Sequence, residues 1–334
     1  MVVGTVGALP TRHPSGILTV PHDRARTLAG SCQVGPLLLR PGGKLFVEYQ
    51  RNDPLALHDS TTVETWPIIV EGEQLNISLD DGSGAVAYRD PEAANARLNA
   101  PLLHRLSALL SLAWGEAWQV RTAPTMASRL PAAVPQSWPS PHRFDRPKPG
   151  LPPDPQPLPA RVAAAWDQVE FDPHLEAAMS AWHQGIFLTS EFPSFALVAF
   201  GGCIEEVSRS VPLAPEIGVL PEACSECGNI PAAARRFREA VHLVADEAEL
   251  DQLVREWKVY NKRSRIAHGS ALHGIEQIYG SMFHWRYEPP TLTRGARYAV
   301  DEADEEQVFT LKILPTTGNI AARLLYRALG APMS

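Results

Sequence analysis

The spacing of hydrophobic and polar residues changes character near residue 160. Before it, short β-rich runs at 17–20, 35–39, 44–49 and 66–70 are followed by an alternating run at 75–79 and its expected hairpin partner at 85–88. A helix with a broad leucine face is expected from Pro101, in its first turn, to about Trp118. The pattern predicts a small β-rich (α+β) domain over residues 1–130.

After residue 160 the apolar spacing is helical almost throughout. Helices are expected at 161–169, 173–187, 193–209, 231–246, 248–267 and 320–329. Strands are expected at 285–287 and 308–314, around an acidic run at 301–306 that we interpret as a solvated loop. Short connections between the helices favour an all-α antiparallel bundle over residues 160–334, and the fold class as a whole is α+β.

A proline-rich segment separates the two predicted domains. Of the 31 prolines in 334 residues, 11 fall between Pro131 and Pro159, among Ser, Asp, Lys and Gln. Proline removes a backbone donor that a helix needs, so such a segment favours an extended, semi-rigid spacer. We predict a linker over residues 131–159.

Composition limits the classes of function. The formal net charge of -7 argues against bulk electrostatic binding along nucleic acid, but it allows one local basic patch that acts on RNA. No apolar run is long enough to cross a membrane, and the first residues lack the basic region of a signal peptide. Four cysteines are too few for a disulfide framework. We expect a cytoplasmic protein without membrane contact.

The strongest chemical motif closes the predicted helix at 248–267. It contains Arg263, Ser264 and His268, followed by Gly269 at the expected C-terminal cap. A helix end attracts cations through its dipole, which explains the charges but not the histidine. Histidine exchanges a proton near neutral pH, and arginine binds phosphate through two parallel hydrogen bonds. Together they can promote the attack of a ribose 2′-hydroxyl on the adjacent phosphate.

The spacing of this motif raises a geometric question. Five positions along a straight helix turn by about 140°, so Arg263 and His268 would not share one face. Either the helix ends or tightens near Ala267 and turns His268 round, or two subunits assemble the site. The candidate RNA contacts are the nearby basic residues Lys258, Lys262, Arg265 and His273. For His273, a surface or capping role is the simpler interpretation.

The pattern Tyr260-x-x-Arg263-Ser264-x-Ile266-x-His268-Gly269 resembles the signature of HEPN domains, particularly the ApeA-like group of bacterial anti-phage proteins. Upstream, the apolar helix that ends in Glu205-Glu206 and the run Arg236-Phe237-Arg238 are similar to the preceding helices of that family. The resemblance covers roughly residues 160–280. The segment at 280–314 departs from the family's layout, because it is longer than a simple loop.

The resemblance implies a HEPN-like helical bundle that forms a homodimer, with the motifs of both copies facing one cleft. It also implies a metal-independent endoribonuclease that acts in bacterial anti-phage defence or as a toxin. His268 would be the acid/base group and Arg263 the phosphate-binding cation, with Ser264 at the polar position and Glu205 or Glu206 orienting the pair. The β-rich domain would sense a trigger or restrain the activity. Because some members of the family are inactive, a dimerisation or RNA-binding scaffold is the alternative function.

A second, weaker motif is the Cys-x-x-Cys pair of Cys224 and Cys227. In a reducing compartment zinc is the usual functional interpretation of such a pair, and a closed structural site needs four ligands. The candidates to complete it are Cys203 and one of His183, His242 or His273. An unmetallated loop and a partial zinc site fit the sequence equally well, and the expected catalysis requires no cofactor. No motif of a phosphate-binding glycine loop, a zinc protease or a serine hydrolase is present.

Overall fold

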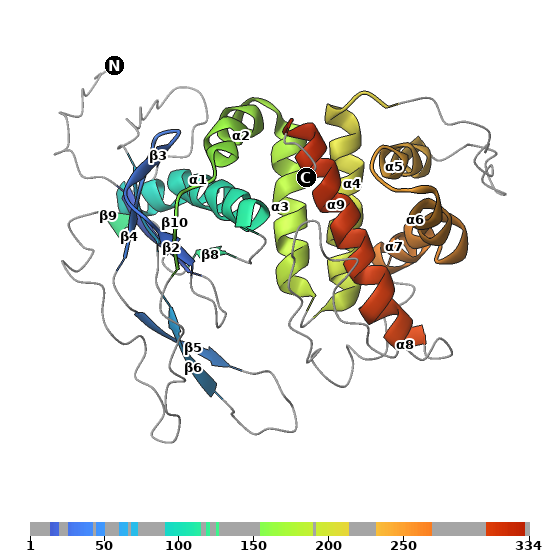
Figure 1. The fold of residues 1–334 in the computed structure, drawn as a ribbon, viewed down its shortest axis with the longest axis horizontal. Coiled ribbons are helices and arrows are strands. Elements are labelled where there is room, and N and C mark those ends of the chain that lie inside the picture. Colours follow the sequence, from blue (N-terminus) through green and yellow to red (C-terminus); the bar gives the residue numbers. More distant parts are fainter. Residues whose placement is uncertain are drawn as a thin grey trace, which may run out of the picture. The chain divides into compact units, whose positions relative to one another are not determined.

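The computed structural model describes residues 14–19, 26–42, 45–50, 60–65, 68–72, 91–114, 118–120, 125–126, 154–189, 192–213, 232–268 and 305–330. The chain forms two compact units (Figure 1). The sheet unit comprises Met1–Arg51, Ser60–Ser107 and Trp118–Trp166, and the helical unit comprises Asn52–Asp59, Ala108–Ala117 and Asp167–Ser334. A small sheet region accompanies a mostly helical one, which confirms the α+β class at this coarse level.

An antiparallel sheet is the main element of the sheet unit. Its strands lie in the order β3 (Cys32–Val34), β4 (Leu37–Pro41), β7 (Ile68–Gly72), β1 (Pro14–Thr19) and β8 (Gln119–Val120), and β9 (Thr125–Met126) also pairs with β1. Along β4, Leu37 and Leu39 are buried and Leu38 is exposed, which is the alternation of a strand with one covered face. The antiparallel character predicted for this region is confirmed.

Two smaller ladders belong to the same unit. β5 (Leu45–Gln50) pairs antiparallel with β6 (Ser60–Thr65), and β10 (Asp154–Gln156) pairs in parallel with β2 (Arg26–Leu28). β10 comes from the proline-rich segment that we predicted as a linker, so that end of the segment contributes to a ladder. The expected strands at 75–79, 85–88 and 285–287 lie outside the described residues.

The helix α1 (Pro91–Trp114) corrects the prediction of a helix from Pro101 to Trp118. It begins earlier, so Pro101 lies inside the helix and not in its first turn. Proline is favoured in a first turn, but an interior proline can persist at the cost of one backbone hydrogen bond. The predicted leucine face is buried, at Leu103, Leu106, Leu109, Leu110 and Leu112.

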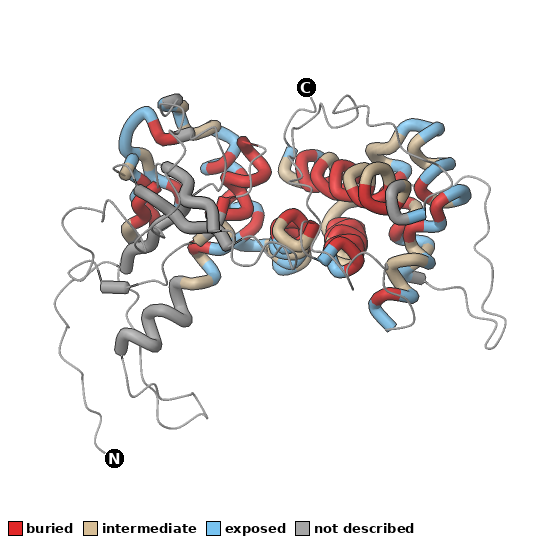
Figure 2. The backbone as a smooth tube through the Cα atoms, turned by 90° about the horizontal axis from the view of Figure 1, so that it is seen from below, coloured by how far each residue is buried: buried red, intermediate tan, exposed pale blue. Residues whose placement is uncertain are grey.

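The helical unit is built around α4 (Pro193–Ser210). This helix packs against α3 (Pro173–Leu188), α9 (Leu314–Ala328), α5 (Ala232–His242) and α7 (Val259–Ala267). Buried residues, red in Figure 2, are frequent in α4 and α9, whereas α7 buries only Val259 and Ile266. The buried side chains of α4 include Ala196, Leu197, Phe200, Cys203, Ile204 and Val207. Gly185 lets α3 approach closely, because a Cβ there would lie 2.5 Å from Phe200. α3, α4 and α2 (Ala160–Phe171) lie close to their predicted positions, whereas α5 ends before the predicted residue 246 and α9 begins before the predicted residue 320.

The prediction of one continuous helix over 248–267 is wrong. The segment divides into α6 (Glu247–Asp251), a π-helical turn η2 (Gln252–Glu256) and α7. Lys258 stands between η2 and α7 in the left-handed conformation, with φ 49° and ψ 48°. A residue in the left-handed region interrupts a right-handed helix. Because this residue is a lysine and not a glycine, neither the residue type nor the hydrophobic spacing predicts the break.

The prediction of a strand at 308–314 is also wrong. α8 (Glu305–Val308) and the π-helical turn η5 (Phe309–Ile313) lead directly into α9. Aromatic and β-branched residues made this run resemble a strand. Phe309, Ile313 and Leu314 are instead buried at helical spacing, so packing in the helical unit overrides the local preference. The first two residues of α8, Glu305 and Glu306, belong to the acidic run that is interpreted above as a loop.

Candidate functional site

The motif residues lie on α7 and at its end. α7 ends at Ala267, as one of our two alternatives required, and His268 is its C-terminal cap with φ -90° and ψ 8°. The backbone N–H of His268 donates to the Ser264 carbonyl at 3.0 Å. The His268 side chain is exposed, so it is open to a substrate or to another chain.

Arg263 points from α7 to the middle of α4. Its Nη2 donates to Glu205 Oε2 at 2.9 Å, and both side chains are largely buried, with 21% and 18% of their surface exposed. Gly201, one turn before Glu205, provides the space for this approach. A Cβ on Gly201 would lie 2.9 Å from Arg263 Cγ, closer than real Cβ contacts. The sequence thus places a glycine where the arginine stem crosses α4.

Burial dominates the electrostatics of this Arg263–Glu205 pair. It raises the pKa of Glu205; the neighbouring Glu206 adds to the rise, whereas Arg263 and Arg209 oppose it. Burial and the Glu205 charge likewise raise the pKa of Tyr260, against the influence of Arg263. The ionised Glu205 is therefore held at a net cost, because its one strong partner does not fully replace the lost water.

Two atoms of the pair have unused hydrogen-bonding capacity. Glu205 Oε1 and Arg263 Nε are buried and have no hydrogen-bond partner among the described residues. Buried polar atoms usually have hydrogen-bond partners, so Glu205 Oε1 can accept, and Arg263 Nε can donate, one further hydrogen bond. Tyr260, which interacts electrostatically with both members of the pair, packs on Phe237 of α5 with ring centroids 5.6 Å apart.

Glu206 lies in a different setting from Glu205. Its Oε2 is 2.8 Å from His174 Nδ1 at the start of α3, and its Oε1 is 3.6 Å from Arg209 Nη1. The sequence left Glu205 and Glu206 as alternatives for orienting the motif, with Glu206 counted among the candidate catalytic residues. In the folded chain it is Glu205 that contacts Arg263, while Glu206 belongs to a separate cluster with His174 and Arg209.

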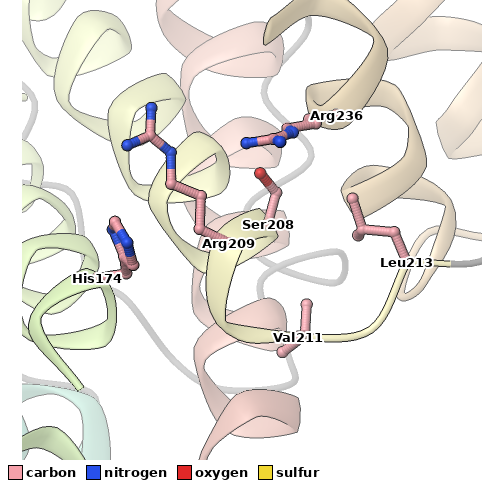
Figure 3. Close-up of a pocket in the computed structure, with 6 residues that line it drawn as sticks. All are labelled: His174, Ser208, Arg209, Val211, Leu213 and Arg236. Carbon is pink, nitrogen blue, oxygen red and sulfur yellow. The ribbon is translucent and has the colours of Figure 1, made fainter. Parts of the chain in front are cut away.

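This second cluster borders an open hollow (Figure 3). The hollow is lined by His174, Ser208, Arg209, Val211, Leu213 and Arg236. Sequence reasoning did not single out His174 or Arg209 as site residues. The spacing of Glu206 and Arg209, three positions apart on a helix, is the one local signal for part of the cluster. His174 joins it through tertiary packing of α3 on α4, which the sequence pattern does not encode.

The other candidate residues have varied positions. Ser264 and Lys262 are half-buried on α7, whereas Lys258 and Arg265 are exposed. His273, Cys224 and Cys227 lie outside the described residues. Of the candidates to complete a zinc site, Cys203 and His183 are buried and His242 is exposed. Within the described part of the chain, no three His, Cys, Asp or Glu side chains are grouped to hold a metal ion.

Comparison with known proteins adds no relative. No protein-family model matches the chain, and neither the curated proteins nor the solved structures include a significant match. Over the described residues, no helix combines the length and the apolar character needed to cross a bilayer. The chemistry of the site residues is therefore the basis for proposing a function.

Proposed function

We propose that this protein is a metal-independent endoribonuclease of the HEPN type. The observation that carries the proposal is the ion pair between Arg263 Nη2 and Glu205 Oε2, at 2.9 Å. It joins the arginine of the motif to the acidic end of the apolar helix, two of the features on which the resemblance rests. The pair holds the guanidinium in a defined orientation beside an exposed basic segment, which is what binding of a phosphate in a fixed position requires.

The proposed reaction is an internal transfer at one phosphate of RNA. The 2′-oxygen attacks the adjacent phosphorus and its proton passes to a base; the bond from phosphorus to the 5′-oxygen breaks, and that oxygen takes up a proton. The products are a 2′,3′-cyclic phosphate and a 5′-hydroxyl. His268 acts as the proton-transfer group, and Arg263 stabilises the charge that builds on the phosphate oxygens. Exposed Arg265 and Lys258, with Lys262, bind the flanking backbone.

We further propose that two copies of the chain form the cleft. Arg263 is turned towards α4 while His268 caps the end of α7 with an exposed side chain. A homodimer can place His268 of one copy near Arg263 of the other without bending either helix. The role of the sheet unit in sensing a trigger, and the link to bacterial defence, stay predictions.

Cleavage of labelled RNA in the presence of EDTA tests the proposal. Wild-type protein should release fragments with cyclic phosphate ends, and His268→Ala should cleave about 100-fold or more slowly, because positioned proton transfer contributes at least that factor. His242→Ala, which removes another exposed histidine, is the matched control and should cleave like wild type. Equal cleavage by His268→Ala, or activity that disappears with the chelator, would contradict the mechanism.

One observation favours a second function, a scaffold without catalysis. The Arg263 guanidinium is already bound to Glu205, as it would be in a purely structural ion pair. A scaffold of this kind would dimerise or bind RNA and leave it intact. Intact RNA in the wild-type assay, together with binding that His268→Ala does not weaken, would support the scaffold over the nuclease.

A further inference from the structure

The hollow beside Glu206 lies at the C-terminal end of α4, where the starts of α3 and α5 come close to it (Figure 3). Its volume is about 510 Å³. Pockets for small molecules commonly have volumes of about 300–1,000 Å³, so the hollow has room for a ligand of nucleotide size. None of its six lining residues belongs to the Arg263–Glu205 pair.

Two arginines give the hollow its charge. Arg236 is exposed on α5, and its guanidinium extends across the hollow towards α4 in Figure 3. No residue that the structure describes pairs with it. Arg209 has one long contact, 3.6 Å, with Glu206. Glu206 also contacts His174, and Asp172 is a second carboxylate beside that histidine, but the lining residues are two arginines and a histidine with neither carboxylate among them. The balance of charge at the hollow is positive, which favours an anion.

The remaining lining groups suggest what else the ligand contains. Ser208 Oγ donates to the Glu205 carbonyl at 2.5 Å, so its proton is already used within α4. Val211 and Leu213 supply half-buried apolar side chains on the segment that leaves α4. Cations on one side and apolar groups on the other match a ligand that carries both a phosphate and a flat, weakly polar body.

We infer that this hollow binds the phosphate groups of a ligand of nucleotide size, at a site separate from the Arg263 motif. The Arg236 and Arg209 guanidinium groups hold the phosphate oxygens, because a planar guanidinium can donate two parallel hydrogen bonds to them. Arg209 exchanges its long contact with Glu206 for the phosphate, and Glu206 keeps its contact with His174. The body of the ligand lies against Val211 and Leu213.

Calorimetric titration of the full chain tests this site. Pyrophosphate and the four ribonucleoside 5′-diphosphates are titrated separately into wild type, Arg236→Gln, Arg209→Gln and the control Arg255→Gln, which removes an exposed arginine of η2. At least one nucleotide should bind wild type and Arg255→Gln equally. Arg236→Gln and Arg209→Gln should each bind it about tenfold more weakly or worse, since each loses a charge-assisted contact. The corresponding nucleoside, which lacks the phosphates, should bind the wild-type protein about tenfold more weakly or worse than the nucleotide does.

Three results would overturn the inference. The first is the absence of saturable binding by every probe at concentrations up to about 1 mM, the weak end of specific affinity. The second is unchanged nucleotide binding by Arg236→Gln, a variant of an exposed residue that should fold normally. The third is a case in which no nucleotide binds but both arginine variants bind a DNA oligonucleotide more weakly than wild type does. The hollow would then be part of a strand-binding surface. Each of these readouts is independent of RNA cleavage.

Discussion

Glu205 and Glu206 are neighbours on α4, but they face two regions with opposite physical character. Glu205 turns to α7, where burial and one arginine fix it in place. Glu206 turns to α3, where it shares its charge between His174 and Arg209 at the border of an open hollow. The Arg263–Glu205 pair is thus fixed within the helical unit, whereas the contacts of Glu206 are longer or more exposed. Adjacent residues of one helix therefore belong to two separate clusters.

The comparison is tested most severely by removing one arginine from each region. Arg263→Gln should lower the free energy of unfolding at pH 7 by about 1–3 kcal/mol, because it leaves the largely buried Glu205 carboxyl without its partner. Arg209→Gln should cost less than about 1 kcal/mol, because its ion pair is long and solvent-exposed. Urea denaturation measures both. Under the proposed function, Arg263→Gln should also slow RNA cleavage by about 100-fold. Equal losses of stability would show that the two regions do not differ as described.

Two adjacent glycines of α4 offer a finer test. Alanine at Gly202 meets no atom within 4 Å, so Gly202→Ala should raise the free energy of unfolding by about 0.5–1 kcal/mol through helix propensity. Alanine at Gly201 would contact the Arg263 stem, so Gly201→Ala should lower it by about 1 kcal/mol or more. Thermal or urea unfolding distinguishes the two. A stabilising Gly201→Ala would mean that Arg263 moves aside freely and that the pair is not fixed by packing.

The smallest expected effect concerns the pH dependence of stability. Because the pKa of Glu205 is raised in the folded chain above its ordinary value of 4.5, the folded state binds this proton more tightly than the unfolded state does. The contribution of Glu205 to stability therefore falls as pH rises above about 4.5 through the folded pKa. Glu205→Gln removes this dependence, so unfolding at pH 4 to 7 should favour the variant increasingly as pH rises. If the free energy of unfolding of the wild type rose relative to that of the variant between pH 4 and 7, the pKa of Glu205 would be lowered and not raised by folding.

Much of the helical unit could be predicted from hydrophobic spacing. The positions of α3 and α4 follow from apolar residues at helical intervals after a proline, and the buried character of α4 follows from its Ala-Leu-Phe-rich interior. The predicted strand at 308–314 is wrong because the local β preference of its residues competed with tertiary packing. Val308 and Phe309 favour a strand locally, but burial within the helical unit makes them helical. β10, only three residues long and containing a proline, has too little pattern to be seen without its partner β2.

The candidate site likewise contains residues that the sequence predicts and residues that it does not. Arg263, Ser264 and His268 could be found because they lie together in the sequence and stand at a helix end. The partner of Arg263 could be narrowed only to two adjacent acids, since the choice depends on which side of α4 faces α7. Gly201 and the residues of the hollow gave no usable signal, because their roles arise where separate helices meet.

Lys258 links the irregular segment before α7 to the orientation of the site. A residue in the left-handed region turns the chain sharply, and the helix that follows starts with a rotational phase set by that turn. Each added or deleted residue between Lys258 and Arg263 would rotate the arginine by about 100° around the axis of α7 and carry it away from Gly201 and Glu205. The angular setting of the guanidinium is therefore determined five positions before it, and the number of residues from that turn to Arg263 has to be preserved for the arginine to reach Glu205.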